Sequence, residues 1–355
     1  ISGVIMEFKI GNRMIGNKHP VYFIAEAGVN HNGSTDLAYK LIDAAKEAGA
    51  DAVKFQTFKT ESLSTVRAPK STYHKETTGD DNEQSWFDLL KTQEMSLQMH
   101  KDLIAYCEKV GITFLSTPYD FESVDLLEEM GVPAYKLASC DITNIPLIKY
   151  IASKGKPLIL SSGMTTIEEI NRAISTLEES NLINYALLQC TANYPSPLEQ
   201  SHLRVITTYK AMYDCVIGYS DHTEGHVNPI AAVAMGAKIY EKHYTLDRTL
   251  PGPDHRMSME PNELKETIDF IRATESTMGN SIKQVLDVES ENRIKMRKSL
   301  VFNNDLEEGQ LLSEKDIGIK RPGSGMEPFL FDDVVGKKLS ISVKKDDLIC
   351  PETLI

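Results

Sequence analysis

Eight short apolar runs alternate with helical patterns along this chain of 355 residues, and this alternation limits the possible folds more than any other feature. Between the runs, apolar side chains recur with the helical period, as at Leu37, Leu41 and Ile42. Eight strands that are each followed by a helix predict a closed (β/α)8 barrel, an α/β fold of about 250 residues. The expected strands occupy residues 21–29, 52–57, 113–118, 134–139, 157–163, 185–191, 215–222 and 238–245.

An open, doubly wound sheet is the alternative arrangement of the same elements. It is disfavoured because no glycine-rich G-x-G-x-x-G turn follows the first expected strand. Residues 58–94 separate the second strand from its helix and exceed the usual length of such a connection. We therefore expect them to form a functional lid or an excursion at the active-site face.

The character of the chain changes after the last expected barrel helix. We predict a barrel domain over residues 1–275, a polar and highly charged linker over 276–298, and a small domain of short β-like runs over 299–355. Within the small domain, segments 308–314 and 346–352 resemble each other, which suggests a pseudo-symmetric module. A unit of fewer than about 60 residues is marginally stable alone, so we expect it to dock on another surface.

Composition restricts the partners and the compartment. The formal charge of −13 argues against a protein whose main role is binding nucleic acid or anionic lipid. No stretch approaches about 20 consecutive apolar residues, and residues 1–18 lack the basic and apolar regions of a secretory signal, so we expect neither a membrane span nor secretion. Five scattered cysteines without C-x-x-C spacing predict reduced thiols in a cytoplasmic protein.

Polar residues are concentrated at the carboxyl ends of the expected strands, where the catalytic groups of a barrel collect. Among them, Lys54 and Lys136 with the neighbouring hydroxyl groups indicate a site for a phosphorylated or carboxylated anion. The alternative is that either lysine simply extends from the barrel mouth into water. The polar residues at these ends are Glu26, Asn30, His31, Lys54, Gln56, Ser116, Thr117, Lys136, Ser139, Ser161, Ser162, Gln189, Thr191, Asn193, Ser220, Asp221, His222, Glu241 and His243.

Two histidines indicate a metal site. His222 and His243 end neighbouring strands, and two imidazoles with water or carboxylate oxygens suit a divalent ion such as Mn²⁺, Fe²⁺ or Zn²⁺. A single strand histidine is more often a core residue, but two at one rim favour a metal. His31 lies in a turn before Ser34, where capping and substrate contact are equally good explanations. We expect five further histidines to lie at the surface: His74, His100, His202, His226 and His255.

Two loops add candidate residues. The rigid segment 251–254 follows the eighth strand and would position Asp254 over the barrel mouth, and Lys320 and Arg321 enter a glycine-rich turn of the small domain. Taken in order, nine segments carry a wider pattern. They are EAGVNHNG at 26–33, KFQT at 54–57, STP at 116–118, YKLAS at 135–139, LSSGM at 160–164, GYSDHT at 218–223, EKH at 241–243, PGPD at 251–254 and KRPG at 320–323.

This set of segments resembles the sialic acid synthase family. The resemblance implies a (β/α)8 barrel followed by an antifreeze-like (SAF) domain, in a domain-swapped homodimer where the SAF domain of one subunit covers the active site of the other. It also implies a transferase that condenses phosphoenolpyruvate with an N-acetylated amino-hexose. The product would be a nine-carbon 2-keto acid, with release of phosphate. The sugar would be N-acetylmannosamine or a diacetamido analogue. The family includes the synthases of N-acetylneuraminate, legionaminate and pseudaminate.

The resemblance assigns roles residue by residue. His222 and His243 would hold the divalent metal, Mn²⁺ or Mg²⁺, and Glu26 would orient a water molecule. Together with Lys54 these are the expected catalytic residues. Phosphoenolpyruvate would contact Lys54, Thr117, Lys136, Ser139, Ser161 and Ser220. The sugar would contact Glu26, Gln56, Asp141, Asn193, Tyr194, Asp254 and the Arg321 of the partner subunit.

Two departures from the family pattern leave the sugar open. Asp141 stands where many N-acetylneuraminate synthases have Glu, and Ala192 stands where some relatives have Asn or Ser. Two further functions compete with the synthase. A metal-dependent hydrolase on the same barrel predicts an H-x-H pair on the first strand, which residues 24–26 lack. A non-catalytic sugar-binding or ice-binding protein would not require the rim lysines and histidines.

Overall fold

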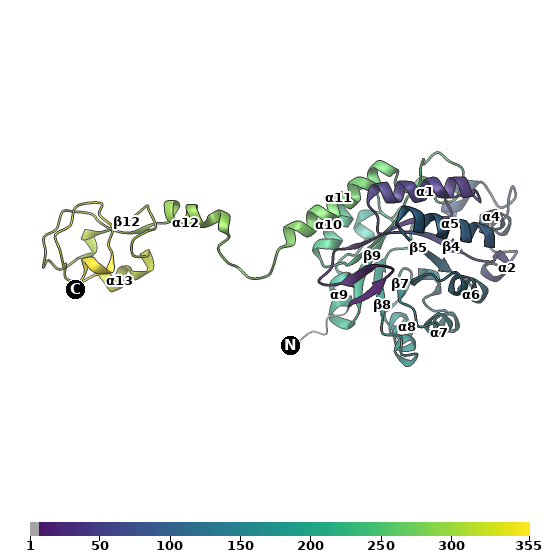
Figure 1. The fold of residues 1–355 in the computed structure, drawn as a ribbon, viewed down its shortest axis with the longest axis horizontal. Coiled ribbons are helices and arrows are strands. Elements are labelled where there is room, and N and C mark those ends of the chain that lie inside the picture. Colours follow the sequence, from purple (N-terminus) through teal and green to yellow (C-terminus); the bar gives the residue numbers. More distant parts are fainter. Residues whose placement is uncertain (1–6) are drawn as a thin grey trace. The chain divides into compact units, whose positions relative to one another are not determined.

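The computed structural model describes residues 7–355, which belong to two compact units that we treat separately. The first unit ends at Gly279, and the second comprises Asn280–Ile355 (Figure 1). The predicted linker, residues 276–298, is partly helical: α11 (Pro261–Met278) extends into it and α12 (Ser290–Met296) lies within it. No helix among residues 7–355 is long and apolar enough to cross a membrane.

The first unit contains the eight expected strands in one parallel sheet. Their order is β5-β4-β3-β10-β9-β8-β7-β6, and the end strands β5 and β6 contact each other, so the sheet closes into the predicted barrel. The strands are β3 (Tyr22–Gly28), β4 (Ala52–Thr57), β5 (Thr113–Pro118), β6 (Tyr135–Leu137), β7 (Leu158–Ser161), β8 (Tyr185–Cys190), β9 (Val216–Asp221) and β10 (Ile239–His243).

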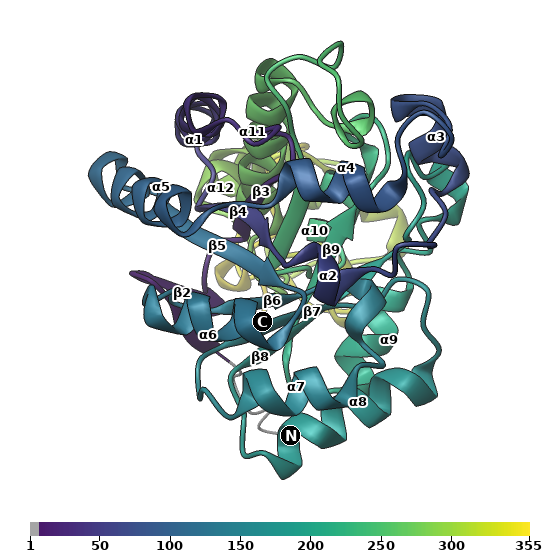
Figure 2. The ribbon, with the colours of Figure 1, turned by 90° about the vertical axis from the view of Figure 1, so that its right-hand side faces the viewer.

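A helix follows each barrel strand, and Figure 2 shows these helices arranged around the central strands. The first of them is formed for local reasons: Ser34 caps its start by accepting a hydrogen bond from the amide of Leu37, and Gly49 ends it with a left-handed φ of 90°. The helices are α1 (Thr35–Ala48), α5 (Leu97–Val110), α6 (Phe121–Glu129), α7 (Ile145–Ala152), α8 (Ile167–Glu179), α9 (Val205–Met212), α10 (Val227–Ala234) and α11.

The long connection after β4 is folded rather than irregular. It contains three short helices, α2 (Thr60–Leu63), α3 (Thr72–Thr78) and α4 (Trp86–Gln93). Leu90 packs with Val29 of the barrel in a small apolar cluster, against which Leu63 and Trp86 are also packed. The segment therefore forms a lid that is anchored to the carboxyl end of the barrel, as its length suggested.

A hairpin that the sequence did not predict closes the other end of the barrel. Strands β1 (Glu7–Ile10) and β2 (Arg13–Gly16) pair antiparallel and precede the first barrel strand. Their side chains Phe8, Ile10 and Ile15 belong to the same buried cluster as residues near the beginnings of the barrel strands. The hairpin thus excludes water from the amino-terminal end of the barrel interior.

The second unit has a core of its own. Strands β11 (Ser299–Phe302) and β12 (Ile317–Lys320) pair antiparallel, α13 (Phe331–Val334) follows them, and isolated bridges connect the remaining short β segments. Leu300, Phe302 and Ile349 are among its fully buried side chains. A small domain of mostly short β elements was expected here.

Asp51 provides a test of how the barrel base is held together. Its buried carboxylate accepts a hydrogen bond from the amide of Phe23 at 2.8 Å and lies 2.9 Å from an Arg13 nitrogen and 3.1 Å from an Arg272 nitrogen. We expect Asp51→Ala to lower the free energy of unfolding by about 1–3 kcal/mol, because these charge-assisted bonds are lost together. Urea unfolding followed by the fluorescence of Trp86 measures the change.

The matched control is Asp269→Ala, which removes an exposed carboxylate paired with Lys265 on the same helix. We expect a change of at most about 0.5 kcal/mol, since exposed pairs contribute little. Equal losses in the two variants would contradict a special role for Asp51.

Candidate functional site

Two buried lysines lie within barrel strands, and one carboxylate joins them. Lys54 on β4 and Lys136 on β6 are 4% and 2% exposed. The Oε2 atom of Glu241 on β10 is 3.3 Å from the Nζ atom of Lys54, and its Oε1 atom is 3.6 Å from the Nζ atom of Lys136. A buried ammonium group without a partner is costly, so this carboxylate allows both lysines to stay inside the barrel.

Glu26 on β3 is a second carboxylate partner of Lys54. Its Oε2 atom lies 3.0 Å from the Nζ atom of Lys54, and its Oε1 atom accepts a hydrogen bond from the amide of Gln56 at 3.2 Å. The side chain of Glu26 is 1% exposed. The barrel mouth therefore holds two cations and two carboxylates in one buried cluster, which we call the charge cluster: Glu26, Lys54, Lys136 and Glu241.

The two carboxylates of the charge cluster have different proton affinities. Burial raises the pKa of Glu26 to about 7, a rise that Lys54 opposes and the charge of Glu241 increases. Burial alone would also raise the pKa of Glu241, but the ammonium groups of Lys136 and Lys54 hold it well below its usual range. At neutral pH Glu241 is thus the ionised counter-ion, while Glu26 exchanges a proton. Carboxylates with separated pKa values are typical of acid–base sites.

Hydroxyl groups extend the charge cluster on both sides. The Nζ atom of Lys54 donates a hydrogen bond to Oγ1 of Thr117 at 3.1 Å, and that of Lys136 donates one to Oγ of Ser161 at 2.7 Å. Burial lowers the pKa of Lys136, whereas for Lys54 the charges of Glu241 and Glu26 outweigh burial and raise its pKa. Each lysine is therefore oriented by a hydroxyl as well as by a carboxylate.

The other two predicted hydroxyl groups belong to β9 and to the segment that follows β6. Ser220 on β9 donates a hydrogen bond to Oε1 of Glu241 at 3.0 Å. Ser139 begins the short 3-10 helix η1 (Ser139–Asp141), and its Oγ atom accepts a hydrogen bond from the amide of Gly163 at 2.9 Å. Directional donors thus accompany the ammonium groups, which is the combination that binds phosphate and carboxylate oxygens.

His222 and His243, the histidine pair, lie side by side, with ring centroids 5.6 Å apart. The Nδ1 atom of His222 lies 2.8 Å from the carbonyl oxygen of Thr191. Because a carbonyl only accepts, Nδ1 carries a proton and Nε2 points away from this hydrogen bond. Burial alone would lower the pKa of His222, but Cys190 and the carbonyl of Thr191 raise it. The ring of Tyr194 covers the pair, with its centroid 4.3 Å from that of His222.

The second ring of the pair also has a free nitrogen. The Nδ1 atom of His243 is buried without a hydrogen-bond partner among the described residues. Burial and the neighbouring His222 keep the pKa of His243 well below its usual range, so the ring is neutral at pH 7. Within residues 7–355 no group of three or more His, Cys, Asp or Glu side chains is placed to hold a metal ion. The two neighbouring imidazoles fit a divalent ion only where water or substrate oxygens supply its other ligands.

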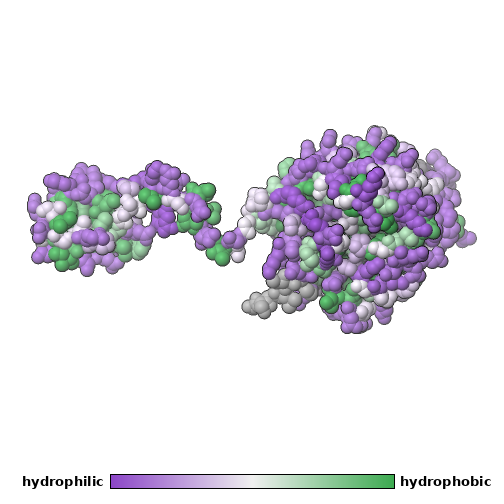
Figure 3. Space-filling view, in the orientation of Figure 1, coloured by the Kyte–Doolittle hydropathy of each residue, from purple (hydrophilic) through white to green (hydrophobic). Residues whose placement is uncertain are grey.

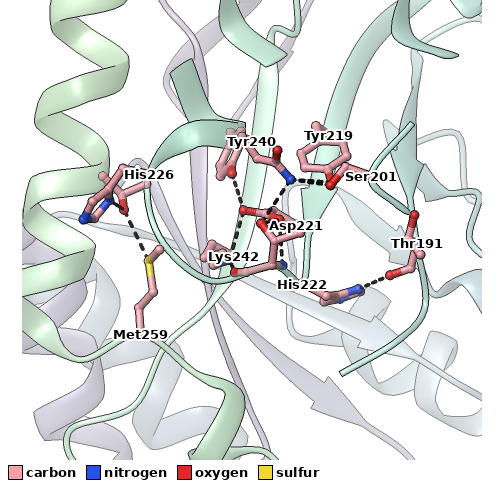
Figure 4. Close-up of polar contacts among 12 residues, drawn as sticks. Thr191, Ser201, Tyr219, Asp221, His222, His226, Tyr240, Lys242 and Met259 are labelled. Atoms are coloured by element: carbon pink, nitrogen blue, oxygen red, sulfur yellow. Dashed lines mark hydrogen bonds and ion pairs between the residues drawn. The ribbon is translucent and has the colours of Figure 1, made fainter. Parts of the chain in front are cut away.

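On the outer face of the barrel, a buried ion pair connects the ends of β9 and β10. Asp221 and Lys242 alternate with the inward-facing residues, and their charged atoms are 2.9 Å apart (Figure 4). The Tyr240 hydroxyl donates to the same Asp221 oxygen, and Lys242 also donates to the carbonyl of Thr223. These contacts fix the backbone that carries the histidine pair.

A cavity of about 280 Å³ opens beside the histidine pair. Gln56, Tyr194, His243 and Asp254 supply its polar side, so the structure brings three predicted sugar-binding residues together around one space. Burial raises the pKa of Asp254 to about 6, although His222 opposes the rise. The lid completes the cavity from the opposite side.

Four predicted sugar-binding residues do not line this cavity: Glu26, which belongs to the charge cluster, and Asp141, Asn193 and Arg321. The carboxylate of Asp141 accepts a hydrogen bond from the side-chain amide of Asn144 at 2.9 Å, within its own turn. Asn193 is exposed and donates to the backbone carbonyl two residues later. Arg321 belongs to the second unit, where it donates to the carbonyl of Met296 at 3.1 Å.

Sequence reasoning placed Glu241 at the barrel mouth but did not include it in the site. The structure puts it between both lysines. Its spacing contained the signal, because Glu241 and His243 are two residues apart on one strand and so face the same side. The lid residues Leu63 and Trp86 were missed as well, because their approach to the cavity depends on the fold of α2 and α4.

The prediction that the remaining histidines lie at the surface is wrong for two of them. His100 and His255 are each 1% exposed. His100 bonds to Thr57 at 2.9 Å and His255 to Thr245 at 2.6 Å, which satisfies the buried rings. His31 is also buried, and its Nδ1 atom accepts from the amide of Gly33, in keeping with the turn explanation.

Known proteins share both the sequence and the fold. Residues 41–283 match the model of the NeuB family, and residues 297–355 match the SAF domain. N,N'-diacetyllegionaminic acid synthase of Campylobacter jejuni is 42% identical over 328 residues, which cover 92% of this chain and 98% of that one. N-acetylneuraminate-9-phosphate synthase of Homo sapiens is 36% identical over 343 residues, which cover 96% and 94%. The crystal structure of N-acetylneuraminic acid synthetase from Leptospira borgpetersenii superposes with a TM-score of 0.72 at 36% identity, covering 82% and 96%.

The raised pKa of Glu26 predicts how anion binding depends on pH. Below about pH 7 Glu26 is neutral and Lys54 is free to pair with a bound anion; above it the Glu26 carboxylate competes for Lys54 and repels the anion. We expect the affinity for phosphoenolpyruvate to fall as pH rises through 7, by up to about tenfold per pH unit. Calorimetric titration between pH 6 and 8.5 measures this dependence.

Glu26→Gln is the control, since it keeps the shape of the side chain and removes its charge. The phosphate of the ligand titrates identically with both proteins, so the difference between wild type and variant isolates Glu26. Parallel pH profiles for the two proteins would contradict the assignment.

Proposed function

The chain belongs to the NeuB family, and we propose that it condenses phosphoenolpyruvate with an N-acetylated amino-hexose to a nine-carbon 2-keto sugar acid, releasing phosphate. The observation that carries this proposal is the charge cluster beside the histidine pair, which puts two buried ammonium groups next to a cavity whose lining holds no lysine or arginine. Such a site can bind an anion at the lysines and a neutral sugar in the cavity.

The anion is held by the lysines and the hydroxyl groups. Lys54 and Lys136 supply point charges for the phosphate and carboxylate of phosphoenolpyruvate. The hydroxyl groups supply directional donors from four different strand ends. The hydrogen bonds of Thr117 and Ser161 to the lysines support this role, because these two groups are already oriented before the ligand arrives. The proposed contacts are Lys54, Thr117, Lys136, Ser139, Ser161 and Ser220.

The sugar occupies the cavity beside the histidine pair. Gln56, Tyr194 and Asp254 face it from the barrel, which is supported by their places in the cavity lining. Asp141 and Asn193 stay proposed sugar contacts that require a rearrangement of their present hydrogen bonds. Arg321 holds the N-acetyl group from the SAF domain of a second subunit.

The histidine pair holds the divalent metal, Mn²⁺ or Mg²⁺, through the free nitrogens of His222 and His243. When bound, such an ion polarises the aldehyde oxygen of the open-chain sugar. The hydrogen bond from His222 to Thr191 and the outer ion pair of Asp221 and Lys242 keep these rings oriented.

The residues of the charge cluster serve each step of the reaction. C3 of phosphoenolpyruvate attacks the aldehyde carbon, so a carbon–carbon bond forms and positive charge develops at C2. Glu26, which is neutral beside the bound anion, gives its proton to the aldehyde oxygen and becomes a carboxylate. Water oriented by this carboxylate adds to C2 and returns a proton to it. The bond between C2 and the phosphate oxygen then breaks, phosphate leaves with the proton of the C2 hydroxyl group, and the 2-keto group forms. Lys54 and Lys136 stabilise the negative charge on phosphate and carboxylate throughout.

The active assembly is a domain-swapped homodimer. Support comes from the segment that connects the two units, which exposes large apolar side chains that a second copy of the chain would cover; Figure 3 shows hydrophobic atoms on this segment. The exposed side chains are Met278, Ile282, Val285, Leu286, Val288, Ile294 and Met296. The five cysteines form no disulfide, which supports the cytoplasm as the compartment.

A sugar panel tests the reaction. Purified protein with Mn²⁺ and phosphoenolpyruvate should release phosphate only when a suitable sugar is added, because water adds to C2 only after C3 has attacked the sugar aldehyde. The panel contains N-acetylmannosamine, its phosphate ester and diacetamido hexoses. Release is measured by a colorimetric phosphate assay and the product by mass spectrometry.

Lys136→Met should reduce the sugar-dependent rate by at least about a hundredfold, since one point charge on the anion is lost. Lys149→Met, which removes an exposed lysine of α7, is the control and should leave the rate unchanged. Absence of sugar-dependent release with every member of the panel would refute the proposed reaction.

Mixed dimers test the swapped arrangement. Homodimers of Arg321→Ala and of His222→Ala should each be inactive or nearly so. When the two variants are mixed and allowed to exchange subunits, one site in each heterodimer combines an intact barrel with an intact SAF domain. We therefore expect up to about a quarter of the wild-type activity, from one good site in half of the dimers.

The control mixture contains Arg321→Ala and wild-type protein tagged for purification, which shows that subunits exchange. Recovery of no activity from heterodimers that demonstrably form would refute the contribution of Arg321 to the opposite subunit.

A further inference from the structure

A separate cavity of about 640 Å³ lies at the amino-terminal end of the barrel. Pro20 and Lys238 line it, and they precede the first residues of β3 and β10, whose other ends carry Glu26 and His243. The connection between β2 and β3, the helix α9, the turn between α10 and β10 and the end of α11 form its walls. The cavity belongs wholly to the first unit, and its size is that of a small-molecule site.

Three lysines line this cavity, and we call them the lysine cluster: Lys18, Lys210 and Lys238. Glu275 is the one carboxylate among the described residues of the lining. The chain as a whole has 38 basic and 51 acidic residues, so the cavity reverses the overall balance of charge. An excess of lysine in a concave space attracts anions.

The nearby carboxylates already have partners. Oε1 of Glu275 accepts a hydrogen bond from the amide of Val21 at 2.5 Å, and its Oε2 lies 2.9 Å from a nitrogen of Arg272. His19, which also lines the cavity, has its Nε2 atom 2.7 Å from Oε2 of Glu7. The lysine cluster is therefore left with surplus positive charge.

Two ammonium groups of the lysine cluster are positioned by backbone carbonyls. Lys210 donates to the carbonyl of Met235 at 3.3 Å, and Lys238 donates to that of His19 at 3.0 Å. Gly236 leaves room for the Nζ atom of Lys210, because a Cβ atom there would clash with it. A carbonyl carries no net charge and uses one of the three hydrogens of an ammonium group, so charge and donors remain for a ligand.

The lysines of the cavity also repel each other. Burial lowers the pKa of Lys238, and the charge of Lys210 lowers it further, while Glu275 opposes both effects. An anion bound to both ammonium groups would relieve this repulsion and stabilise their charged forms. The electrostatics therefore favour an occupied cavity over an empty one.

The lining indicates the kind of anion. No arginine lines the cavity among the described residues, so the planar two-pronged contact that arginine makes with a carboxylate is not offered. Lysine binds phosphate as a point charge, and several lysines can surround one tetrahedral group. Val233 and Ala237 are buried in the wall and add an apolar surface for the organic part of a ligand.

We propose that the lysine cluster binds a phosphorylated small molecule at the amino-terminal end of the barrel, apart from the charge cluster and the histidine pair. None of the residues that carry this inference takes part in the proposed reaction. The inference therefore stands or falls independently of the proposed function.

Inorganic pyrophosphate is a suitable probe. Full-length protein is dialysed to equilibrium against labelled pyrophosphate in EDTA at low ionic strength, up to about tenfold above the dissociation constant of the wild type. In Lys210→Gln/Lys238→Gln the affinity of the cavity should fall at least about tenfold, because two charge-assisted contacts are lost. We expect the wild type to bind one equivalent more tightly than this variant does. Pyrophosphate at the barrel mouth binds to both proteins alike, so the difference reports the cavity.

Lys40→Gln/Lys101→Gln is the matched control. It removes the same net charge from two exposed lysines outside the cavity lining and should bind pyrophosphate like the wild type. Lys18→Gln leaves both backbone contacts of the lysine cluster intact and should weaken the same equivalent by at least about threefold. This single variant gives the answer if urea unfolding shows that the double variant is unstable.

The outcomes are distinct. A loss confined to the variants of the lysine cluster would support the inference, whatever the sugar panel shows about the reaction. Equal binding by these variants and the wild type would overturn it, and so would an equal loss in Lys40→Gln/Lys101→Gln, because net charge alone would then explain the effect. Displacement of the additional equivalent by an equal concentration of sulfate would overturn the assignment to phosphate.

Discussion

The burial of two ammonium groups at one end of a closed barrel is the constraint on which the rest of the structure depends. Lys54 and Lys136 stay there because Glu241 lies between them. Glu241 faces inward only in the observed register, in which it pairs with Ser220 of β9. A slip of one residue would turn Lys242 into the barrel and Glu241 out of it, leaving three cations with Glu26 as the one carboxylate of the charge cluster. The register of β10 is therefore an electrostatic requirement as well as a packing one.

Several features far from the lysines maintain that register. Asp221 and Lys242 pair on the outer face of the same strands, so a slip would break this ion pair too. Gly218 on β9 permits the close approach of β10, since a Cβ atom there would lie 2.4 Å from the carbonyl oxygen of Ile239. At the base, Asp51 joins the hairpin, the first barrel strand and α11. The site at one end of the barrel thus relies on contacts at its wall and at its other end.

The sequence predicted the features that depend on residues close together in the chain. The eight strands are apolar runs bounded by turn residues, and the lysines and histidines stand at their carboxyl ends, so both followed from the pattern. The central position of Glu241 did not follow, because it depends on which strands become neighbours. The hairpin formed by residues 7–16 was missed because its strands have only four residues each. His100 and His255 looked like surface residues because their partners are distant in sequence or lie in loops.

The protonation of Glu26 connects the two halves of the proposed reaction. In the free protein, Lys54 lowers the pKa of Glu26, and burial raises it. When the anionic groups of phosphoenolpyruvate pair with Lys54, they take away part of this stabilisation and add negative charge nearby, so Glu26 binds a proton more tightly. The departure of phosphate reverses both effects and releases that proton. The net charge of −13 describes the outer surface, whereas inside the barrel burial and the opposing charge of Lys54 set the proton affinity of the residue that orients water.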